Sequence, residues 1–166
     1  MASLFFLLFP GIGFFLGLLF LGFQPGWEWL KHPESYPLEL WVIVFGGLVA
    51  TLGGFFDWRF HRSKQLTIWV KERQCELIAL GAVGAPLFIL MTLASVSHHP
   101  NQYLPLVLVV LLFTVVMICY DEFVFHRKRC GKYETLLHRM LVFGNGLAWL
   151  AWANWCFVKG GVYVVS

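Results

Sequence analysis

The chain has 166 residues, of which 59% are hydrophobic and only 13% are charged. A soluble domain carries about 25% charged residues, so this composition excludes an ordinary soluble protein. The formal net charge is only +3, and no basic stretch carries the aromatic residues of an RNA-binding motif, so we expect no nucleic-acid partner.

Five apolar runs follow one another along the chain. They lie at 3–23, 38–56, 78–96, 103–120 and 140–158. Each is close to the ~20 residues that a bilayer-spanning helix needs. The first run lacks a preceding basic segment and a clear cleavage site, so we interpret it as a retained helix and not as a signal peptide. We therefore predict an all-α integral membrane protein with five transmembrane helices in a single domain, residues 1–166.

The basic residues predict the orientation of these helices. Ten of the 12 Lys and Arg residues lie in two segments, 59–73 and 127–139. The positive-inside rule places both segments in the cytoplasm. The N-terminus is then cytoplasmic and the C-terminus lies outside, and we expect the inner membrane of a bacterium as the location.

A weak internal repeat relates residues 56–84 to residues 121–146. Asp57 and His61 in the first copy correspond to Glu122 and His126 in the second. In each copy a short polar connector joins two apolar runs, and short connectors make neighbouring helices antiparallel. We predict that the second to fifth helices form two antiparallel hairpins in one bundle.

Four pairs of acidic or histidine side chains, each four residues apart, lie at the cytoplasmic end of this bundle. The pairs are Asp57/His61, Glu72/Glu76, Glu122/His126 and Glu134/His138. Residues four apart share one face of a helix, so each pair offers two metal-binding side chains that point the same way. Acids beside Lys and Arg at a membrane surface also form simple salt bridges, and that explanation competes for each pair taken alone.

Charge favours metal binding by the eight side chains together. Five carboxylates in one pocket repel one another, and two divalent ions would nearly neutralise them. Carboxylate and imidazole ligands suit iron and manganese, and also zinc. We predict two metal ions, with iron first and manganese or zinc as alternatives, and with Glu76 or Glu134 as the bridging ligand.

The predicted cluster resembles the site of the di-iron carboxylate proteins in ligand type and architecture. Those proteins hold two metals inside a four-helix bundle with Glu and Glu-x-x-His ligands. The spacing differs here, because each pair is four residues apart where the family motif has three. The resemblance implies a metal centre between the second to fifth helices, and it covers residues 57–138.

We expect a membrane-embedded oxidoreductase with a di-iron site at the cytoplasmic face. Its substrate would be a lipid, an alkyl chain or a quinol, an apolar small molecule delivered through the bilayer. Two alternatives remain open. One is a zinc-dependent membrane hydrolase, in which zinc activates a bound water. The other is a non-enzymatic small subunit or assembly factor, in a homo-oligomer or a larger membrane complex. No residue is assigned a catalytic role.

Overall fold

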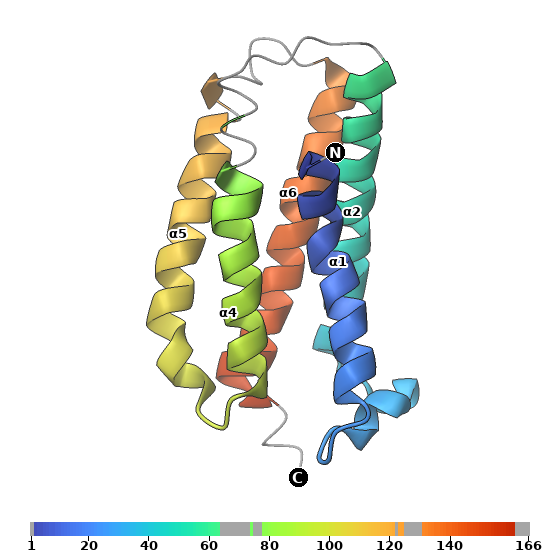
Figure 1. Cartoon of the computed structure of the whole chain (residues 1–166), viewed down its shortest axis with the longest axis vertical. Helices are drawn as coiled ribbons and strands as arrows, with labels where there is room; N and C mark the ends of the chain where they lie inside the picture. Colours follow the sequence, from blue (N-terminus) through green and yellow to red (C-terminus); the bar gives the residue numbers. More distant parts are fainter. Residues whose placement is uncertain (1, 64–73, 75–77, 122, 125–130, 162–166) are drawn as a thin grey trace.

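The computed structural model describes residues 2–63, 74, 78–121, 123–124 and 131–161, and these residues form helices joined by short turns. The helices run roughly parallel to one long axis (Figure 1). Their bounds are α1 Ala2–Leu21, α2 Leu38–Ser63, α4 Ala85–Val96, α5 Leu104–Asp121 and α6 Lys132–Ala153. The described part of the chain contains no strand, as the sequence predicts.

Shorter helical turns extend or connect these helices. The loop after α1 holds the 3₁₀ turns η1 (Glu28–Lys31) and η2 (Pro33–Ser35), and η4 (Pro100–Tyr103) connects α4 to α5. Two π-helical turns continue a helix without a break. They are η3 (Ile78–Gly84), which leads into α4, and η6 (Asn154–Val158), which prolongs α6.

Three helices are long and apolar enough to cross a membrane. They are Leu38–Ser63, Pro100–Tyr120 and Lys132–Val158. Leu8–Leu21 and Ala85–Val96 are also apolar but shorter. All five apolar runs of the sequence contain helix, and three of them are confirmed as candidate spans by length and composition.

Large apolar side chains cover much of the molecule's surface. Phe143 is 71% exposed, Phe20 66% and Leu112 66%. A soluble monomer rarely exposes so much continuous apolar surface, whereas lipid solvates it without cost. The exposed side chains therefore agree with a membrane location.

The most extensive helix packing is that of α2 with α6. The two helices are next to each other at the top of Figure 1, and their other ends are joined by the hydrogen bond of Asn154 with Glu39. A Cβ atom added to Gly46 would lie 2.7 Å from the carbonyl oxygen of Gly144, and one added to Gly144 would lie 2.6 Å from that of Gly46. Only glycine permits this backbone contact, which is how small residues bring membrane helices together. A Cβ atom added to Gly53 would likewise lie 2.8 Å from the carbonyl oxygen of Leu137.

The pairing of α2 with α6 joins the first predicted hairpin to the second. The segments that would connect the hairpins' own helices, 64–73 and 125–130, fall outside the described residues. The helices α4 and α5 are consecutive and pack together around a core with α6 and η6. That core contains Leu87, Ala94, Val107, Trp152 and Cys156.

Candidate metal centre

The helices α2 and α6 are both longer than a bilayer crossing requires. The helix Leu38–Ser63 has 26 residues and Lys132–Val158 has 27, while about 20 residues cross the hydrocarbon core. Charged groups mark the far end of the pair, where the amide of Asn154 donates to Glu39 Oε1 at 2.8 Å and Lys159 Nζ lies 2.5 Å from the same oxygen. In a bilayer, about six residues of α2 and about seven of α6 would therefore extend beyond the core at the other end.

Four of the predicted site residues meet at this projecting end. His61 Nε2 lies 2.6 Å from Glu134 Oε1, and His61 Nδ1 lies 3.5 Å from Asp57 Oδ2. His138 Nε2 lies 3.4 Å from Asp57 Oδ1. Each of the two polar contacts between α2 and α6 therefore joins an imidazole of one helix to a carboxylate of the other.

All four side chains are shielded from solvent. Their exposed fractions are 6% for Glu134, 12% for His61, 15% for His138 and 19% for Asp57. Ionisable groups buried this far are costly unless they are paired or bound to a metal. Pairing within the group offsets part of this burial cost, since two carboxylates face two imidazoles.

One oxygen atom of the cluster lacks a hydrogen bond. Asp57 Oδ1 is buried and accepts none from the described residues. The His138 Nε2 atom is within ion-pair distance of it, at 3.4 Å, but the contact does not have the geometry of a hydrogen bond. A buried polar atom in this state needs an explanation such as an ion.

A metal ion fits between three of these residues. Asp57, Glu134 and His138 each offer one ligand atom, and the three atoms lie within 4.8 Å of one another. Ligand atoms about 2.0–2.2 Å from a zinc ion lie about 3.3 Å apart in a tetrahedral site. The 3.4 Å separation between Asp57 and His138 already meets that spacing, so a modest closure of Glu134 would complete three ligands.

His61 lies beside these three and contacts both carboxylates. A carboxylate oxygen can only accept, so the Nε2–H group donates to Glu134 Oε1. A hydrogen bond of this kind, donated by a residue that does not itself bind the metal, fixes the orientation of a ligating carboxylate. His61 is thus placed to position Glu134, as well as being a candidate ligand itself.

The structure therefore brings together two of the four predicted pairs, Asp57/His61 and Glu134/His138. The other two pairs consist of Glu72, Glu76, Glu122 and His126, and all four residues lie outside the described part of the chain. The convergence of eight ligands and the second metal ion remain predictions.

The small-residue contact is the feature that the sequence analysis missed. Gly46, Ala50, Gly53 and Asp57 follow one another at spacings of four, three and four, so they share one face of α2. That face packs on α6, because Gly46, Ala50 and Gly53 are all buried. The same spacing continues to His61, so one face of α2 carries both the small residues and two of the candidate ligands.

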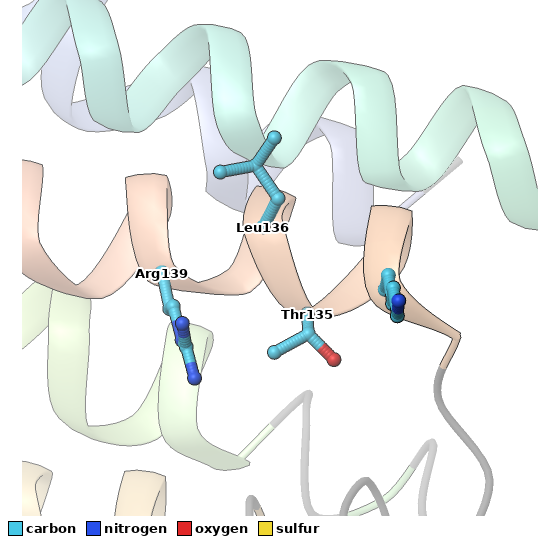
Figure 2. Close-up of a pocket in the computed structure, with 4 residues that line it drawn as sticks. Thr135, Leu136 and Arg139 are labelled. Carbon is cyan, nitrogen blue, oxygen red and sulfur yellow. The ribbon is translucent and has the colours of Figure 1, made fainter.

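Two surface hollows flank this end of the pair. One, of about 380 Å³, is lined by Lys132, Thr135, Leu136 and Arg139 (Figure 2). The other, of about 300 Å³, is lined by Phe56, Arg59, Phe60, Ser63 and Tyr133. Its aromatic rings belong to the turns that carry the candidate ligands, and Phe60 and Tyr133 pack with ring centroids 5.5 Å apart.

Comparison of the chain with protein-family models, curated proteins and solved structures found no match.

Proposed function

We propose that this chain is a membrane protein that binds a divalent metal ion between α2 and α6, in the headgroup layer. Asp57, Glu134 and His138 are the ligands, and His61 orients Glu134. The observation that carries the proposal is the convergence of three donors within 4.8 Å around a buried Asp57 oxygen that lacks a hydrogen bond.

The donor set narrows the choice of metal. Two carboxylates and one imidazole, with no thiolate, suit iron, manganese or zinc. Three protein ligands would leave positions open for water or a substrate, as catalytic sites do. This donor set favours a role in catalysis over a purely structural metal.

We propose an oxidoreductase as the activity, with a second metal ion held by the remaining predicted ligands. Two irons at this level would oxidise an apolar substrate that enters from the bilayer. The aromatic hollow beside Phe60 and Tyr133 lies next to the ligand-bearing turns, and it supports an apolar substrate. A zinc hydrolase uses the same three ligands with one ion, so metal stoichiometry separates the two activities.

Metal analysis of the full chain, purified in mild detergent, tests the site. We expect Asp57→Asn and His138→Gln to lower bound metal at least tenfold after incubation with Fe²⁺ or Zn²⁺. His99→Gln is the matched control, because His99 is exposed in the turn between α4 and α5. Near two irons per chain, with the absorption of coupled ferric ions after exposure to dioxygen, would support the oxidoreductase. One zinc per chain would favour the hydrolase.

The same residues could instead serve only to join α2 to α6 by hydrogen bonds, and this is the competing function. The direct contact of His61 Nε2 with Glu134 Oε1, at 2.6 Å, favours it, because buried hydrogen bonds join membrane helices without any metal. In that case the wild-type chain would bind no metal, and His138→Gln would lower the thermal stability without changing metal content. That result would contradict the metal site.

A further inference from the structure

A basic hollow lies on the face of α6 that points away from the metal centre. Successive residues of an α-helix are about 100° apart, which places Arg139 about 140° around the axis from Glu134. Figure 2 shows Thr135 and Arg139 projecting from the side of α6 opposite α2. The hollow is therefore separate from the candidate ligands, although it lies at the same height on the helix.

Two cations share this hollow. Lys132 and Arg139 are seven residues apart, so they lie on one helix face, about 10 Å apart along the axis. Both side chains are exposed. Among the residues that the structure describes, neither has an acidic group within ion-pair distance. Their charges are thus available to an external anion.

The position of the hollow identifies the kind of anion. In a bilayer, about seven residues at the start of the 27-residue helix would exceed the hydrocarbon core. Lys132 would then lie at the level of the lipid phosphates, and Arg139 at the edge of the core, from which its long side chain reaches that level. The hollow is also lined by Leu136, which is 54% exposed. A cationic hollow with an apolar wall matches a ligand that has a phosphate group and an acyl chain.

The binding must come from the two cations. The hydroxyl of Thr135 donates to the carbonyl oxygen of Gly131, at 3.1 Å, so its proton is not offered to a ligand. Arg presents a planar fork of donors to phosphate, and Lys acts as a mobile point charge. Two long side chains on the same helix face, about two turns apart, can both reach one phosphate that lies between them.

We propose that the hollow formed by Lys132, Thr135, Leu136 and Arg139 binds the phosphate of an anionic phospholipid headgroup. The hollow of about 380 Å³ is large enough for a headgroup and its first acyl carbons. The bound lipid would hold the metal-bearing end of α6 at the membrane surface. The proposal needs a membrane location but does not depend on the metal.

Binding of short-chain lipids to the detergent-purified full chain tests this. The probes are dioctanoylphosphatidylglycerol, dioctanoylphosphatidylcholine and inorganic phosphate, each measured by titration calorimetry. We expect phosphatidylglycerol to bind more than tenfold more tightly than phosphatidylcholine. Lys132→Gln and Arg139→Gln should each weaken it roughly fivefold, because a basic residue near an anionic surface contributes on that scale.

The matched control is Arg62→Gln, which removes one exposed charge at the same end of the neighbouring helix. Arg62 lies over the ring of Trp58, 5.5 Å from its centroid, and outside the hollow. The affinity of the Arg62→Gln variant for phosphatidylglycerol should stay within twofold of that of the wild type. Equal binding of the two lipids, or losses in Arg62→Gln as large as in Arg139→Gln, would overturn the proposal. Inorganic phosphate binding as tightly as phosphatidylglycerol would overturn the lipid as the source of the phosphate.

Discussion

The histidine side chains of the cluster have unequal roles at the scale of single residues. His138 faces Asp57 Oδ1 at 3.4 Å, beside the oxygen that lacks a hydrogen bond. His61 instead donates to Glu134 at 2.6 Å and lies 3.5 Å from Asp57 Oδ2. His138 is thus the better candidate ligand, and His61 is better placed to orient Glu134.

Replacing each histidine should separate these roles. Loss of a group that orients a ligand typically lowers metal affinity 10–100-fold, so we expect that range for His61→Ala. His138→Ala should lower affinity further, because it removes a ligand atom. Competition for Zn²⁺ with a chromogenic chelator measures both. Equal losses in the two variants would assign His61 as a fourth ligand.

The sequence predicts only part of this arrangement. The spacing of four places Asp57 with His61, and Glu134 with His138, because helix geometry is local. It does not predict that His61 meets Glu134, since that contact depends on how far α2 is shifted along α6. The shift is set by the backbone contact of Gly46 with Gly144, which is a property of two segments distant in sequence.

At the scale of the elements, the glycine contacts hold α2 and α6 at one separation. Predicted apolar runs end at residue 56 and begin at residue 140, whereas α2 ends at Ser63 and α6 begins at Lys132. A hydropathy pattern marks the apolar part of a helix, and a helix can continue beyond that part. The polar turns at the ends of α2 and α6 are indicated instead by residues paired four apart, Asp57 with His61 and Glu134 with His138.

Gly46→Ala should destabilise the helix pair. The new methyl group would lie 2.7 Å from the Gly144 carbonyl oxygen, so the helices must separate, and overpacking of this kind costs about 1–3 kcal/mol. The neighbouring Gly47→Ala is the control, because nothing lies within 4 Å of its Cβ position. It should be neutral or stabilise by up to ~1 kcal/mol, since alanine favours helix.

Unfolding in detergent, followed by circular dichroism, measures both glycine variants. Equal stability of Gly46→Ala and Gly47→Ala would show that the two backbones are farther apart than described. A lower metal affinity should accompany the loss of stability in Gly46→Ala, because the same contact sets the spacing of the ligands across the pair.

At the scale of the whole molecule, the site itself constrains the topology. His61 and Glu134 are in contact, so the ends of α2 and α6 lie on the same side of a membrane. The chain between them must then cross the membrane an even number of times. Since α5 is a candidate span, we predict that the segment of η3 and α4 crosses as well, as a fourth span. The structure shows three candidate spans, and we predict that α1 is the fifth.

Cysteine labelling of intact cells checks this topology, in a background without the native cysteines. We expect an impermeant maleimide to label Ser35→Cys and Asn101→Cys, and not Ser63→Cys, because the positive-inside rule places the site end in the cytoplasm. Protection of Ala2→Cys would add α1 as the fifth span. Labelling of Ser63→Cys together with Ser35→Cys would exclude a membrane crossing by α2.

The rigid pairing of α2 with α6 also gives the molecule a fixed hydrophobic thickness. Glu39, paired with Lys159, and Asp57, beside His138, are 18 residues apart on α2, or about 27 Å at 1.5 Å per residue. Two helices joined by backbone contact cannot slide to lengthen this interval. A bilayer a few ångströms thicker would draw one polar end into hydrocarbon or force local thinning, at a cost of fractions of a kcal/mol for each ångström. Bilayer thickness would thus decide whether the candidate ligands Asp57 and His138 lie among the headgroups or in hydrocarbon.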